Sequence, residues 1–99
     1  MKLQVLDAAR DDLVAGFDFY EAREQGIGDH FLACLYSDVE SLRIFGGIHR
    51  RVYKNLQRSL SKRFPFAIYY TVEDDAVIVR AILDCRRNPS WIRTRLRTA

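Results

Sequence analysis

Apolar residues recur every three or four positions in the first half of the chain and at alternate positions in the second half. A short apolar segment, Leu3–Leu6, favours a strand. The apolar stripe from Ala9 to Tyr20 then predicts an amphipathic helix with Asp7 as its N-cap. The Gly-x-Gly sequence at 26–28 favours a turn, so this first helix is expected to end before it.

A second helix is predicted by the apolar stripe from Phe31 to Leu42, with Asp29 as its N-cap. Gly46-Gly47 is typical of a helix end. Two helices joined by so few residues are expected to lie roughly antiparallel, as an αα-hairpin.

After the second helix the apolar period changes to two, which is typical of strands. Segments 48–54 and 58–63 are short and strongly charged, whereas 66–72 and 76–83 have the apolar content of strands. The last of them is expected to place its odd-numbered residues on one face: Val77, Val79, Ala81 and Leu83. Pro65 is expected between strands, because proline cannot donate a ladder hydrogen bond. Asn88-Pro89 predicts the start of a short C-terminal helix.

The predicted order is β-α-α-β-β-β followed by that helix. We therefore expect an α+β fold in which an N-terminal helical hairpin packs on an antiparallel sheet of about four strands. The length of 99 residues fits one domain, residues 1–99. Apolar runs are too short to span a bilayer and no signal peptide is visible, so we expect a cytoplasmic protein with no membrane partner.

The net charge of +3 conceals a strong asymmetry along the chain. Residues 1–46 contain four basic and nine acidic side chains, whereas residues 47–99 contain twelve basic and four acidic ones. This asymmetry indicates a surface for an anionic partner, although a solvated basic face without a ligand would have the same composition. The predicted partner-binding residues are Arg50, Arg51, Lys54, Arg58, Lys62, Arg63, Arg86, Arg87 and Trp91.

Motifs for metal, phosphate-loop or nucleophilic chemistry are weak in this sequence. His30 and His49 have no neighbours at zinc-ligand spacing, and Cys34 and Cys85 lie too far apart to match a ligand motif. Gly26-x-Gly28 lacks the lysine of a phosphate loop. We therefore expect no metal site and no cofactor.

Several segments resemble the toxins of the RelE/ParE superfamily. Phe64–Val72 is similar to the motif FPY-x-I-x-Y-x-V of the ParE-like branch, and Ala76–Trp91 is similar to the motif V-x-A-x-x-H-x-x-R-x-P-x-x-W that follows it. Asp84-Cys85 stands near the histidine of the second motif. In the first half, Ala9-x-x-Asp12-Leu13 and Gly26–Leu32 also agree, so the resemblance covers nearly the whole chain.

The resemblance implies a RelE/ParE-like fold and a role as the toxin of a type II toxin–antitoxin module, a class that includes plasmid-stabilisation systems. It also implies a cognate antitoxin, which binds the toxin in a hetero-oligomer and is often acidic. The family divides between inhibitors of DNA gyrase and endonucleases that cleave mRNA on the ribosome.

In the RNA-cleaving branch, basic strand residues stabilise the phosphate and a late tyrosine assists proton transfer. By position, Arg58 and Arg86 retain two of these places. Three others are occupied by Leu60, Ala67 and Ile92. We therefore expect a gyrase inhibitor without catalysis of its own. The alternatives are an mRNA endonuclease with Arg58 and Arg86 as catalytic residues, and a degenerate, non-toxic binding module.

Overall fold

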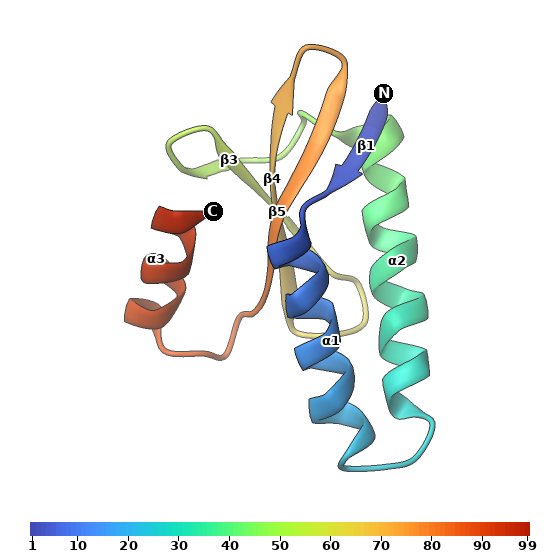
Figure 1. Cartoon of the computed structure of the whole chain (residues 1–99). Coiled ribbons are helices and arrows are strands. Elements are labelled where there is room, and N and C mark those ends of the chain that lie inside the picture. The colour runs from blue at the N-terminus through green and yellow to red at the C-terminus, as the bar shows by residue number, and fades with distance from the viewer.

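The computed structural model describes residues 1–99 and has helices on both faces of one sheet (Figure 1). The elements are β1 (Lys2–Val5), α1 (Asp7–Glu21), α2 (Ile27–Phe45), β2 (Arg51–Tyr53), β3 (Leu56–Leu60), β4 (Phe66–Glu73), β5 (Ala76–Asp84) and α3 (Pro89–Thr98). None of the helices combines the length and apolar character needed to cross a membrane.

The strand order in the sheet is β1-β5-β4-β3-β2. The α+β class, the helical hairpin and the C-terminal helix are confirmed, but two details of the predicted sheet are wrong. It has five strands rather than about four, because a turn at Lys54, with φ of 50°, separates the three-residue β2 from β3. It is mixed rather than antiparallel, because β1 returns beside β5 in parallel orientation.

A β-bulge in β5 changes which side chains face each side of the sheet. The register between β4 and β5 shifts after Tyr69, which leaves Arg80 as an extra residue. Odd-numbered residues before the bulge pack towards α1 and α2, whereas those after it pack towards α3. The predicted shared face is therefore wrong for Val77, Val79, Ala81 and Leu83.

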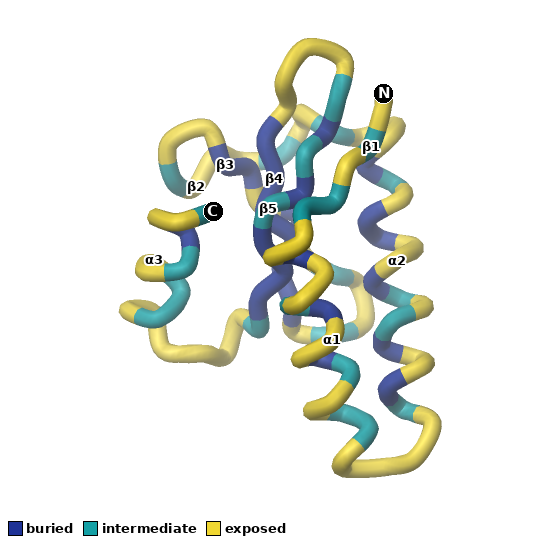
Figure 2. The backbone as a smooth tube through the Cα atoms, viewed as in Figure 1, coloured by how far each residue is buried: buried dark blue, intermediate teal, exposed yellow.

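The sheet separates two apolar clusters. Buried positions lie along the strands and on the sides of the helices that cover them (Figure 2). In the larger cluster, which lies under α1 and α2, the ring of Phe31 contacts the rings of Phe66 at 4.8 Å and Phe64 at 5.2 Å between centroids. The smaller cluster lies on the opposite face, where Leu96 of α3 packs against Tyr69 and its neighbours. The C-terminal helix thus covers a sheet face that the helical hairpin does not reach.

The connection between α1 and α2 is held by Glu21 rather than by the predicted caps. Its carboxylate accepts hydrogen bonds from the N–H groups of Gly26 at 3.1 Å and Gly28 at 2.9 Å. Gly26 has φ of 93°, which favours glycine. Asp7 and Asp29 lie in the first turns of their helices and cap neither, so both cap predictions are wrong.

Candidate functional site

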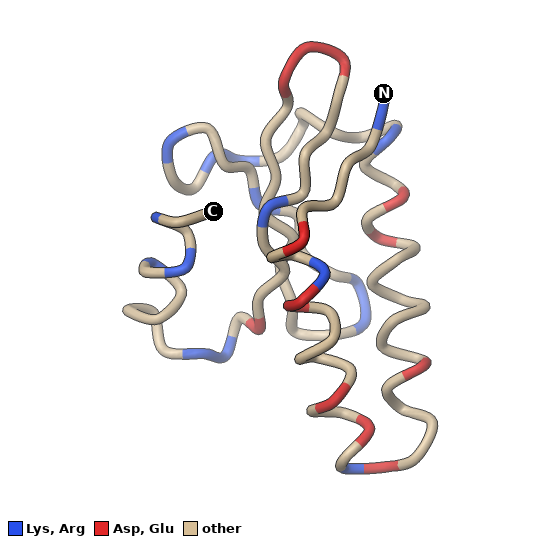
Figure 3. Tube along the Cα trace, in the orientation of Figure 1, with Lys and Arg blue, Asp and Glu red and all other residues tan.

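The predicted partner-binding residues lie in three surface groups at different parts of the sheet. The hairpin group surrounds β2 and β3: Arg50, Arg51, Lys54 and Arg58. The loop group lies between β3 and β4: Lys62 and Arg63. The connection group follows β5: Arg86, Arg87 and Trp91. Acidic residues instead lie along α1 and α2 and in the β4–β5 turn (Figure 3). Acidic and basic side chains are therefore separated in space as well as in sequence.

Among these predicted residues, only Arg86 forms an ion pair. Its Nε and Nη2 atoms lie 3.0 and 2.7 Å from the two oxygens of Asp84, and Nη2 also lies 3.4 Å from the hydroxyl of Tyr20. These hydrogen bonds hold the pKa of Asp84 below its usual value. The other cations in the three groups have no acidic partner at ion-pair distance. Their charges remain available to a partner.

The two residues considered for RNA cleavage occupy different environments. Arg58 lies on β3 near the Tyr69 hydroxyl and the Cys85 thiol, whereas Arg86 is held by Asp84. Burial raises the pKa of both Tyr69 and Cys85, and the charge of Arg58 opposes this rise only in part. Both groups therefore keep their protons at neutral pH, which does not suit a general base.

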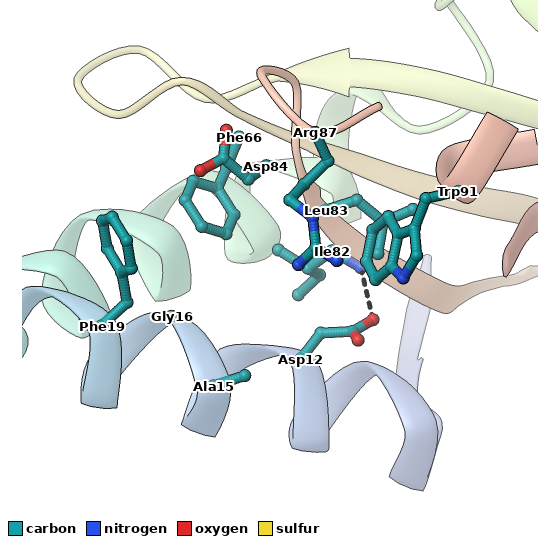
Figure 4. Close-up of a pocket in the computed structure, with 10 residues that line it drawn as sticks. All are labelled: Asp12, Ala15, Gly16, Phe19, Phe66, Ile82, Leu83, Asp84, Arg87 and Trp91. Atoms are coloured by element: carbon teal, nitrogen blue, oxygen red, sulfur yellow. Dashed lines mark hydrogen bonds between the residues drawn. The ribbon is translucent and has the colours of Figure 1, made fainter. Parts of the chain in front are cut away.

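No three histidine, cysteine, aspartate or glutamate side chains lie together where they could hold a metal ion. The structure does contain a pocket of about 230 Å³ beside the connection group (Figure 4). It opens between α1, the end of β5 and the start of α3. Its lining residues are Asp12, Ala15, Gly16, Phe19, Phe66, Ile82, Leu83, Asp84, Arg87 and Trp91.

Asp12 joins three elements at one end of this pocket. Its carboxylate accepts a hydrogen bond from the Ile82 N–H of β5 at 3.0 Å (Figure 4) and two from the guanidinium of Arg95 on α3, at 2.9 and 3.0 Å. Burial raises the pKa of Asp12, although both partners act in the opposite direction. Sequence reasoning placed Asp12 in a family motif but missed this role, because Arg95 is 83 residues away.

Tyr70 is a second residue whose role the sequence did not reveal. Its hydroxyl accepts a hydrogen bond from the Gly47 N–H at 3.0 Å, donates one to Gln57 Oε1 at 3.1 Å, and lies 2.5 Å from His49 Nδ1. The side chain is fully buried, and burial raises its pKa. Tyr70 therefore fastens the α2–β2 connection, and with it the hairpin group, to the sheet.

Replacing Tyr70 by phenylalanine is expected to lower the free energy of unfolding by about 2 kcal/mol, because the buried Gln57 side chain and two partly buried hydrogen bonds lose the hydroxyl. Urea unfolding measures this change. Tyr69→Phe is the matched control, since the adjacent hydroxyl has no such set of backbone and side-chain partners, and its cost should stay below about 1 kcal/mol. Equal losses in the two variants would contradict the role assigned to Tyr70.

The similarity of this chain to known proteins is visible in its structure. No protein-family model and no curated protein sequence matches it. Among solved structures, a chain from the "Chromosomal ParDE TA system from P. aeruginosa" is similar, with a TM-score of 0.77 and 17% sequence identity, over 83% of this chain and 92% of that chain. At this identity the likeness concerns the fold. The chain therefore has the ParE-like toxin fold that its motifs predict.

Proposed function

We propose that residues 1–99 form the single toxin domain of a type II toxin–antitoxin module, which acts in the cytoplasm as a ParE-like inhibitor of DNA gyrase. A cognate antitoxin would neutralise it in a hetero-oligomeric complex. The observation that carries this proposal is the set of predicted partner-binding cations, which apart from Arg86 have no intramolecular acid partner. They are presented on a scaffold similar to a chain of a ParDE system.

Binding without catalysis is favoured by the residues available. Leu60, Ala67 and Ile92 cannot supply the basic and phenolic groups that RNA cleavage would use at those positions. Arg86 is already engaged by Asp84. The alternative of mRNA cleavage is supported by Arg58, whose charge has no acidic partner.

The experiment that tests the proposal is a supercoiling assay with purified gyrase, with and without the protein. Inhibited supercoiling with accumulation of cleaved DNA is the expected result. Undisturbed supercoiling would reject the gyrase target. Primer extension on translated mRNA then distinguishes the alternatives: codon-linked cuts would assign endonuclease activity, and intact mRNA with normal growth would assign a non-toxic binding module.

The loop group offers a direct test of the role of charge. Lys62→Glu and Arg63→Glu together are expected to reduce the association rate with gyrase by about tenfold or more at low ionic strength, because long-range attraction accelerates encounter. The difference should shrink as salt screens the charges. Surface plasmon resonance at several salt concentrations measures both effects.

The matched control carries Lys2→Glu and Arg10→Glu, which make the same charge change in the first half of the chain. Its association rate should fall much less. Equal loss in the two double variants would show that net charge alone, rather than its location, governs association.

A further inference from the structure

We propose that the pocket between α1, the end of β5 and α3 receives one large apolar side chain of an acidic polypeptide segment, with an adjacent carboxylate bound by Arg87. The segment belongs to the antitoxin, so this inference rests on the proposed function and adds to it an anchor point and its chemistry. Three properties of the pocket carry the inference: the arrangement of α1 and β5 that forms it, its apolar lining, and its one charged group without a counter-ion.

The pocket exists because β5 is longer than its neighbour β1. Pairing between these strands ends at Val5 and Val79, and α1 lies beside the rest of β5. The part of α1 that faces this end of the strand carries small residues, Ala15 and Gly16. A Cβ atom at Gly16 would lie 2.5 Å from the Phe31 ring, so this position cannot hold a side chain that fills the space.

The walls of the pocket are mainly apolar. Phe19, 38% exposed, stands on the α1 side and Trp91 on the α3 side, with Ile82 and Leu83 of β5 between the two elements (Figure 4). The volume of about 230 Å³ is below the ~300–1,000 Å³ of pockets for small-molecule ligands. It suits a single side chain inserted from a larger partner.

Both carboxylates of the pocket are already engaged. Asp12 is bound by Arg95 and the Ile82 N–H, and Asp84 is bound by Arg86. Arg87 is therefore the one charged group of the lining that has no counter-ion.

Arg87 is also positioned to bind an anion. Its guanidinium carbon lies 3.7 Å from the centre of the Trp91 ring, and this stacking restrains the side chain (Figure 4). A planar guanidinium that is held in place binds a carboxylate through two parallel hydrogen bonds. An acidic residue next to the inserted apolar side chain is thus the complement of this pocket.

An acidic polypeptide fits this site better than RNA does. The edge of a nucleobase needs several hydrogen-bond partners, and the two carboxylates of the pocket already accept hydrogen bonds from the Ile82 N–H, Arg95 and Arg86. An apolar side chain needs none. Binding of RNA is therefore an outcome that the test must be able to detect.

The test uses Trp91, the only tryptophan of the chain, as a reporter inside the site. The indole N–H signal of the full chain is followed by NMR during titration with N-acetyl-L-leucine and with N-acetyl-L-leucinamide. These probes share the apolar side chain, and only the first carries a carboxylate. We expect the carboxylate probe to bind about tenfold more tightly, and Arg87→Gln to abolish this preference.

Two exposed alanines of α1 provide matched variants. Ala15→Leu places a side chain into the pocket and should abolish the response to both probes, whereas Ala8→Leu makes the same change outside the pocket and should alter neither. Circular dichroism confirms that both variants fold. An unchanged response in Ala15→Leu, or equal binding of the two probes to the parent chain, would overturn the proposal.

Competition with a uridine trinucleotide tests the alternative that the pocket binds RNA. Displacement of N-acetyl-L-leucine by this RNA, with loss of the effect in Ala15→Leu, would assign the pocket to nucleic acid and overturn the inference. None of these titrations depends on toxicity. A negative result in these titrations therefore contradicts only the binding role proposed for the pocket, whereas undisturbed supercoiling in the gyrase assay contradicts the proposed function.

Discussion

Asp12→Ala is expected to lower the free energy of unfolding by about 3 kcal/mol, because it leaves the partly buried charge of Arg95 without its counter-ion. The change also removes the acceptor of the Ile82 N–H at the end of β5. The loss should appear in urea unfolding as a lower midpoint with little change in slope.

Two further variants test whether the loss in Asp12→Ala comes from the ion pair with Arg95 or from removing any acidic side chain in this part of α1. Asp11→Ala, on an exposed neighbour, should cost less than about 0.5 kcal/mol. Asp12→Asn combined with Arg95→Met should recover most of the stability lost by Asp12→Ala, because the amide oxygen can still accept from Ile82 and no unpaired charge stays buried. A double variant as unstable as the single one would show that the carboxylate does more than neutralise Arg95.

Phe31→Ala is expected to be at least as severe, with a loss of about 4 kcal/mol in the free energy of unfolding. The side chain is fully buried and its ring contacts Tyr20, Phe64 and Phe66. The ring also packs closely against the backbone of Gly16, which has no side chain. Loss of the ring therefore leaves a cavity between the two helices as well as above the sheet.

Phe45→Ala is the matched control for this prediction. The same atoms are removed at the end of α2, where the side chain is 51% exposed, and the expected cost is below about 1 kcal/mol. Thermal unfolding monitored by circular dichroism measures both variants. A small loss in Phe31→Ala would mean that Phe64 and Phe66 collapse into the vacated space.

Features of the fold that depend on regular spacing could be predicted from the sequence. The helical hairpin followed from two apolar stripes, and the β4–β5 pair from alternation around an acidic turn. The bulge at Arg80 could not be predicted, because one inserted residue leaves the composition of the strand unchanged. The capping role of Glu21 was also hidden, since it acts on N–H groups five and seven residues further along the chain.

The residue types of the candidate site could be predicted from the sequence, but the contacts that its arginines make could not. The excess of basic residues in the second half predicted a basic surface for a partner, which stays a prediction. Adjacency in sequence could not show that Arg86 is bound by Asp84 while Arg87 stacks on Trp91. The pocket itself depends on α1 lying beside β5. That arrangement comes from tertiary packing and has no local signature.

The parallel pairing of β1 with β5 constrains when this protein can acquire its native state during synthesis. β1 emerges from the ribosome first, but its neighbour in the sheet begins more than seventy residues later, at Ala76. Contacts of such high sequence separation form late and slow the folding of small domains. Nascent chains therefore remain incompletely folded until β5 has been made.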